Sequence, residues 1–78
     1  MIHKVKLPRL SVATETVMVV EWKCQVGDEV FSGDAILTVE TDKVTTDVVS
    51  PVGGTIIEIC VEPEQEIQIG DIICNIKA

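Results

Sequence analysis

One lysine stands alone in the most acidic part of the chain. It lies in the stretch TVETDKVTTDVV, residues 38–49, where acid-bearing segments flank Lys43 on both sides. Between residues 24 and 76 the sequence holds eleven Asp and Glu residues, and Lys43 is its only Lys or Arg. An amine that is unique in its surroundings can be selected by another molecule, so its chemistry is the first question.

Lys43 has several possible roles. A Schiff-base or general-base lysine needs a dry pocket that lowers its pKa, which a solvent-exposed turn does not offer. A single cation among many carboxylates is a weak electrostatic anchor, and a solubilising lysine is the commonplace alternative. Enzymatic acylation of the amine fits best, because a modifying enzyme must find one lysine and no other. Acylation would remove the charge and lengthen the side chain.

Little else in the sequence could do chemistry. His3 is the only histidine, so no Ser–His or Cys–His pairing is credible, and no glycine-rich phosphate loop occurs. The sequence therefore predicts a carrier and not a catalyst. Cys24, Cys60 and Cys74 form an odd set without CxxC spacing, which predicts small buried hydrophobes in a reducing compartment and no zinc site.

The residues around Lys43 are typical of strands. Val, Ile and Thr make up 30 of the 78 residues, and short runs of them alternate with Gly, Asp and Pro turns. AILTVE leads into Thr41-Asp42-Lys43 and VTTDVVSP leads out, so this segment must turn the chain. The pattern predicts an all-β fold with Lys43 exposed on a hairpin tip.

An internal repeat organises these strands. When the chain is shifted by 37 positions, Val20-Glu21-Trp22 aligns with Ile57-Glu58-Ile59, and Ala35–Val39 aligns with Ile72–Ile76. Two equivalent halves of about four short strands predict two small sheets that face each other with pseudo-two-fold symmetry. By this symmetry we expect the Lys43 tip to lie close to both ends of the chain.

Alternation along the strands assigns the faces of the predicted sheets. Residues predicted to point into the core are Val20, Trp22, Leu37, Val39, Ile57, Ile59, Cys74 and Ile76. Residues predicted to face water are Glu21, Thr38, Glu58 and Asn75.

Length and charge limit the remaining possibilities. A chain of 78 residues suffices for one small domain, 1–78, and the formal charge of −7 argues against nucleic acid and against an anionic membrane surface. No apolar run is long enough to span a bilayer, and residues 1–10 do not resemble a signal peptide. We expect the bacterial cytoplasm, or the mitochondrial matrix if a transit peptide has been removed.

The whole chain resembles the lipoyl domains of the dihydrolipoamide acyltransferase (E2) component of 2-oxo acid dehydrogenase complexes. The motifs that carry the resemblance are GDEVFSGDAILTVETDK and SPVGGTI, which occur in the family's order within residues 21–56. The resemblance implies a flattened eight-stranded barrel made of two four-stranded antiparallel sheets, a barrel-sandwich hybrid. It also implies that the chain is a module, most simply the N-terminal one, of a longer E2 protein.

For the site, the resemblance implies lipoate joined by an amide bond to Lys43. Glu40, Thr41, Asp42 and Val44 match the family's residues around the modified lysine, where recognition occurs. The implied partners are a lipoate ligase or lipoyl transferase, a thiamine-dependent decarboxylase (E1), the E2 catalytic core and dihydrolipoamide dehydrogenase (E3). Lipoate would shuttle acyl groups and reducing equivalents among their active sites.

Two alternatives share this fold. Biotinyl carrier domains of carboxylases typically flank the modified lysine with methionine, whereas Asp42 and Val44 are the neighbours here. An unmodified interaction domain does not need the ETDK tip. The sequence departs from the lipoyl pattern in the loop Ser11–Thr16, where Ser11-Val12-Ala13-Thr14 replaces an acidic-glycine motif. In the family this loop contributes to recognition of E1, so the departure leaves the 2-oxo acid open.

Overall fold

The structure, a computed structural model, describes residues 1–10, 15–42 and 44–78. Lys43 and residues 11–14 of the atypical loop lie outside the described residues. The strands are β1 (Ile2–Lys6), β2 (Thr16–Trp22), β3 (Glu29–Val30), β4 (Ala35–Glu40), β5 (Thr45–Val49), β6 (Gly54–Ile59), β7 (Glu66–Gln68) and β8 (Ile72–Lys77). All regular structure in these ranges is strand, as the sequence predicts.

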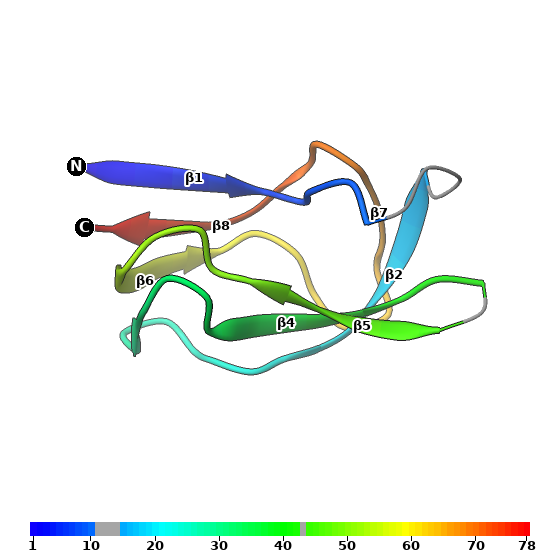
Figure 1. Cartoon of the computed structure of the whole chain (residues 1–78), viewed down its shortest axis with the longest axis horizontal. Coiled ribbons are helices and arrows are strands. Elements are labelled where there is room, and N and C mark those ends of the chain that lie inside the picture. Colours follow the sequence, from blue (N-terminus) through cyan, green and yellow to red (C-terminus); the bar gives the residue numbers. More distant parts are fainter. Residues whose placement is uncertain (11–14, 43) are drawn as a thin grey trace.

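The strands form two antiparallel four-stranded sheets that face each other (Figure 1). One sheet has the order β1-β8-β6-β3 and the other the order β5-β4-β2-β7. A shift of 37 residues maps β2, β3 and β4 onto β6, β7 and β8, and β1 and β5 hold the same edge position in the two orders, so the predicted all-β fold with pseudo-two-fold symmetry is confirmed. Each sheet combines both halves of the chain: the short strand β3 of the first half pairs with β6 of the second, and β7 of the second half pairs with β2 of the first.

The core fills the space between the sheets with aliphatic side chains. Ile36, Leu37, Val39, Ile56 and Ile76 are completely buried. Burial of such side chains, each of which contributes roughly 1.5–3 kcal/mol, is the main force that holds the sheets together. The predicted inward residues Leu37, Val39, Cys74 and Ile76 are therefore correct, and Trp22 and Ile59 pack against the core while half-buried.

The prediction was wrong for Val20 and Ile57, which are 39% and 38% exposed. The register shifts between Val19 and Glu21 where β2 meets β4, and between Ile56 and Glu58 where β6 meets β8. A β-bulge inserts one extra residue and breaks strict alternation. Val19 and Ile56 consequently fill the core, and the repeat places a bulge at the same position in each half.

Turns of one recurrent design link the strands. Asp28, Asp34 and Asp71 each accept a hydrogen bond at Oδ2 from the backbone N–H three residues earlier, at 2.9, 2.9 and 2.8 Å. The glycine before each aspartate has a left-handed φ of 94–98°. At the position equivalent to Gly27, Glu64 adopts φ 69°, a conformation that favours glycine. These turns fix the ends of β3, β4 and β8.

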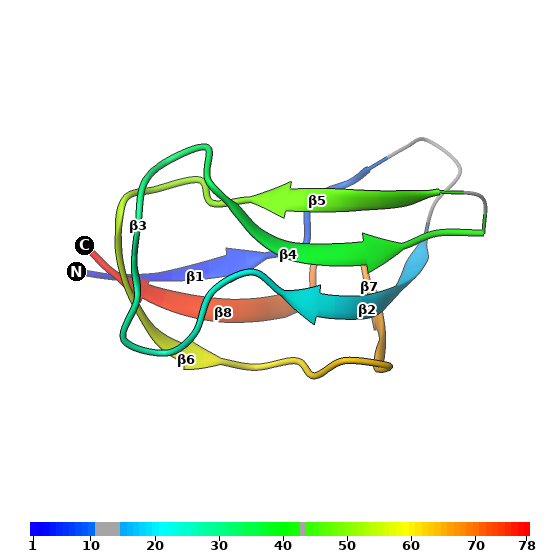
Figure 2. The same cartoon turned by 90° about the horizontal axis from the view of Figure 1, so that it is seen from below.

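The turn between β4 and β5 lies at one end of the molecule and the first and last residues at the other (Figures 1 and 2). The molecule extends 33 Å along its longest axis. The expectation that the Lys43 tip lies close to both chain ends was therefore wrong. The pseudo-two-fold axis exchanges the two ends of the molecule, so positions equivalent by symmetry lie at opposite ends.

Candidate functional site

The hairpin of β4 and β5 supports the candidate site. Its strands pair from Ala35↔Val49 at the base to Glu40↔Thr45 at the tip. Leu37 and Val48, which face each other across the hairpin, are both buried in the core. On the outer face Thr38 Oγ1 donates a 2.8 Å hydrogen bond to Asp47 Oδ1. The base of the hairpin is thus anchored on both faces.

A compact turn closes the hairpin. The backbone N–H of Thr41 donates to the carbonyl of Val44 at 2.9 Å. The Thr41 hydroxyl also donates to that carbonyl at 3.1 Å and accepts from the Val44 N–H at 3.3 Å. Only Asp42 and position 43 lie between these two residues in the sequence. The chain connectivity therefore puts position 43 in the turn itself, while its own placement stays outside the description.

The predicted recognition residues gather around this turn. Glu40, Asp42 and Val44 are exposed, Val44 by 60%, and Thr41 is half-buried. Together with Thr45, these four residues line a shallow surface depression. Among the described residues, ion pairs join Arg9 to Glu15 and Lys23 to Glu21, and none of these four residues lines the depression. The prediction that Lys43 carries the chemistry stays a prediction.

Sequence reasoning missed two side chains on the sheet surface next to the turn. Met18 of β2 lies opposite Glu40 on one side and opposite Glu66 of β7 on the other. Met18 is 42% exposed, and both glutamates are exposed. The repeat in the sequence indicates that β7 exists. It does not indicate that β7 pairs with β2, which depends on the tertiary structure.

The two sheets differ in the charge of their exposed strand residues. The sheet that bears the β4–β5 turn presents Glu21, Glu40, Asp47 and Glu66 among its exposed strand residues. The other sheet carries both signs of charge: exposed lysines lie on β1 and β8, at Lys4, Lys6 and Lys77, and exposed glutamates lie on β3 and β6, at Glu29 and Glu58. Since interactions between exposed charges fade over roughly 10 Å at 0.1 M salt, a molecule approaching the turn meets a locally anionic surface.

The cysteines offer no reactive thiol beside the turn. Cys24 and Cys74 are buried, and burial, followed by the nearby Cys24 and Cys60, raises the pKa of Cys74 to about 12. Burial, followed by Asp28, raises the pKa of Cys24. Cys60 is exposed, so the prediction of three buried thiols was wrong for it. Cys60 directly follows β6 and its N–H donates to the Ile73 carbonyl of β8, so the backbone still pairs there while the side chain is exposed, between half-buried Ile59 and buried Val61.

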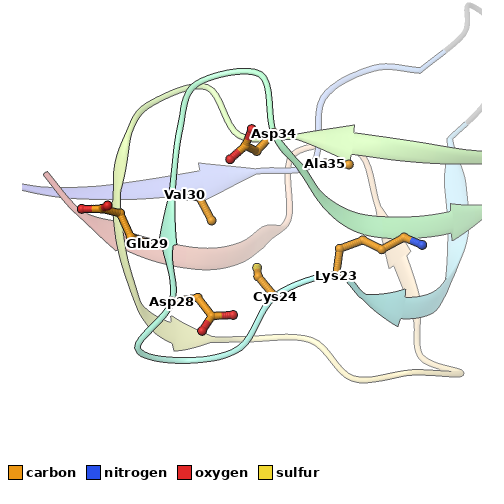
Figure 3. Close-up of a pocket in the computed structure, with 7 residues that line it drawn as sticks. All are labelled: Lys23, Cys24, Asp28, Glu29, Val30, Asp34 and Ala35. Atoms are coloured by element: carbon orange, nitrogen blue, oxygen red, sulfur yellow. The ribbon is translucent and has the colours of Figure 1, made fainter.

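A second hollow lies around β3 and the start of β4 (Figure 3). Its polar lining includes Asp28 and Asp34, which Figure 3 shows on opposite sides of the hollow. One carboxylate oxygen of each already accepts a backbone N–H in its own turn. No group of three or more His, Cys, Asp or Glu in the described ranges is arranged to hold a metal ion. Those ranges also contain no helix with the length and hydrophobicity to cross a membrane.

The fold and the exposed turn define a small carrier-type domain: a rigid β-sandwich that presents one short turn. A family model described as "Biotin-requiring enzyme" (Biotin_lipoyl) matches residues 3–76. The chain therefore belongs to the biotin/lipoyl attachment family, which confirms the resemblance predicted from the sequence.

Within that family the curated relatives are E2 acyltransferase components. The chain is 43% identical over 58 residues to the dihydrolipoyllysine-residue acetyltransferase component of the pyruvate dehydrogenase complex from Acholeplasma laidlawii, covering 74% of the chain. It is 36% identical over 72 residues to the component of the same name from Corynebacterium glutamicum, covering 92% of the chain. The matched regions span only 11% of each of these two proteins.

Solved structures share the fold at low sequence identity. The lipoyl domain of the 2-oxoglutarate dehydrogenase complex from Azotobacter vinelandii matches with a TM-score of 0.75 and 24% identity, over 96% of this chain and 95% of that one. A single-chain long-chain acyl-CoA carboxylase matches with a TM-score of 0.77 and 19% identity, over 95% of this chain and 7% of the carboxylase. The fold is thus common to lipoyl domains and carboxylases, and the sequence relatives favour the lipoyl type.

Proposed function

We propose that this chain is a lipoyl carrier domain whose Lys43 amine is joined to lipoate by an amide bond. The observation that carries the proposal is the turn pinned between Thr41 and Val44 at the far end of a well-anchored hairpin. A ligase must recognise one lysine among six Lys and Arg residues, and a protruding turn of fixed shape permits this. Glu40, Asp42 and Val44, which neighbour Lys43 in the sequence, would serve as the recognition residues.

In this proposal the chain's own residues bind, present and orient, and do not catalyse. The attached dithiolane would supply the acyl-accepting and redox chemistry. The hairpin holds the attachment point away from the body of the domain, so the extended side chain can enter a partner's active site. Tethering then keeps the carried group at a high effective concentration near each site.

The proposed partners follow from the E2 relatives. They are a lipoate ligase or lipoyl transferase, a thiamine-dependent decarboxylase, the E2 catalytic core and dihydrolipoamide dehydrogenase. The anionic surface around Glu40, Asp42 and Glu66 is suited to a cationic patch on such a partner. The domain would then be one module of a longer E2 chain, and we propose the bacterial cytoplasm as its location.

Biotin is the second candidate, since the matching family also includes biotin-requiring enzymes and the carboxylase shares the fold. Asp42 and Val44 stand where biotinyl domains typically have methionine, which favours lipoate. The two candidates differ in which ligase accepts the domain.

Intact-mass spectrometry tests the proposal directly. The domain is incubated with ATP, lipoate and lipoate ligase, or in parallel with ATP, biotin and biotin ligase. We expect one lipoyl-sized increment with the first mixture, none with the second, and none for Lys43→Ala. Lys23→Ala is the matched control and should keep the increment. An increment from biotin ligase alone would move the domain to the carboxylases, and no increment from either would leave an unmodified interaction domain.

A further inference from the structure

The Thr41 side chain makes two hydrogen bonds within the turn between β4 and β5. Its hydroxyl donates to the Val44 carbonyl at 3.1 Å and accepts from the Val44 N–H at 3.3 Å. Thr41 is half-buried, whereas Glu40, Asp42 and Val44 are exposed. The O–H donor of the hydroxyl and one of its two acceptor lone pairs are thus used within the turn, which leaves one lone pair for a second molecule.

These contacts span the residues between which Lys43 lies. The two side-chain hydrogen bonds reinforce the 2.9 Å backbone bond from Thr41 to Val44. Side-chain hydrogen bonds of Thr to nearby backbone groups restrict the conformations of a turn. Without them, one backbone bond alone would set the distance across the turn.

The molecule contains its own comparison at the pseudo-symmetric position. There Ala78 is equivalent to Thr41 and Met1 to Val44, and the Ala78 N–H donates to the Met1 carbonyl at 3.0 Å. The backbone contact is conserved between the two ends, but alanine has no hydroxyl. The side-chain bridge is therefore a special feature of the end that carries Lys43, and not a requirement of the sheet geometry.

We propose that Thr41 is a positioning residue that acts through the turn: its hydroxyl holds the β4–β5 turn in the conformation in which Lys43 is presented for modification. The inference rests on the proposed function, because presentation matters only if Lys43 is modified. A turn that samples several conformations offers the competent one for a fraction of the time. The apparent affinity of the ligase falls by that fraction, while the rate of the bound complex does not change.

The test compares three variants of the free domain in lipoate-ligase kinetics. Thr41→Val keeps the shape and removes the hydroxyl, and Thr41→Ser keeps the hydroxyl. Thr38→Val removes the other side-chain hydrogen bond of the same hairpin, the 2.8 Å bond to Asp47, and leaves the turn intact. Because one hydrogen bond is typically worth about 0.5–1.5 kcal/mol, we expect Thr41→Val to raise KM by about two- to tenfold with kcat unchanged. Thr41→Ser should recover most of the loss, and Thr38→Val should match the parent.

Amide hydrogen exchange at Val44 separates positioning from direct contact. We expect faster exchange of this amide in Thr41→Val and near-parental exchange in the other two variants. A raised KM with unchanged Val44 exchange would mean that the hydroxyl touches the ligase, and equal KM for Thr41→Val and the parent would mean that it has no role; either result overturns the inference. If the parent itself takes no lipoate, the proposed function fails first, and the inference fails with it.

Discussion

The two ends of the molecule have the same backbone design and different side chains. At one end the chain passes continuously through the turn between Thr41 and Val44, and at the other the equivalent residues Ala78 and Met1 meet through a backbone hydrogen bond. Glu40, beside the turn, corresponds to Lys77 at the other end. The repeat therefore builds the same backbone arrangement at both ends of the molecule. What distinguishes the ends is the side chains that each carries.

The largest expected effect concerns packing at the end with the first and last residues. A Cβ at Gly54 would collide with the Lys77 carbonyl and lie 2.7 Å from Ile76 Cγ2, and Gly54 has a φ of 156°. At the equivalent position of the other half, Val17 keeps a buried side chain. We expect Gly54→Ala to lower the free energy of unfolding by about 1–3 kcal/mol or more, as overpacking and backbone strain do. Urea denaturation measures this.

Gly53→Ala is the matched control, since its Cβ would meet nothing closer than the Val30 carbonyl at 3.6 Å. It should change stability by no more than about 1 kcal/mol. If Gly54→Ala proved as mild as Gly53→Ala, the close approach of β6 and β8 would not constrain this end.

An intermediate effect should follow from exchanging charge between the ends. Glu40→Lys places a cation beside Lys43 on the anionic surface, and Lys77→Glu makes the reverse change at the other end. We expect Glu40→Lys to lower kcat/KM with the proposed partner, a thiamine-dependent decarboxylase, by about tenfold at low salt, because complementary charge governs association. Lys77→Glu should leave kcat/KM within about twofold of the parent. Lys77 lies at the end of the molecule opposite the β4–β5 turn, and salt strongly screens interactions between charges that far apart.

Salt dependence is the control for this charge exchange. The deficit of Glu40→Lys should shrink as ionic strength rises. Equal losses in both variants would indicate that the net charge of the domain matters and not the end on which a charge lies.

The smallest effect concerns a turn in which one half has glycine and the other does not. Gly27 has φ 98°, and its equivalent Glu64 has φ 69° without being glycine. We expect Gly27→Ala to destabilise by about 1 kcal/mol, because a side chain strains the left-handed region. Glu64→Gly should stabilise by a few tenths to about 1 kcal/mol as the strain is relieved. Thermal denaturation of the two single variants checks the opposite signs.

The sequence proposes the residues of the candidate site, which stay a prediction, but not their surroundings. Lys43, Glu40, Thr41, Asp42 and Val44 were identified from scarcity, turn chemistry and motif. The depression lined by the four described members with Thr45 agrees with that grouping. The hydroxyl bridge of Thr41 was not predicted, because threonine in a turn has several local partners available and only the closed geometry selects Val44.

The sequence by itself determined the strands, their repeat and the hairpin of β4 and β5 in whose sequence Lys43 falls. These follow from local properties: β-branched residues, Gly-Asp turns and a 37-residue spacing. Only the tertiary structure decided that bulges expose Val20 and Ile57, that β7 brings Glu66 next to Met18, and that the turn lies opposite the chain ends. The physical reason is that register and strand exchange depend on how two distant segments fit against each other, which no local pattern encodes.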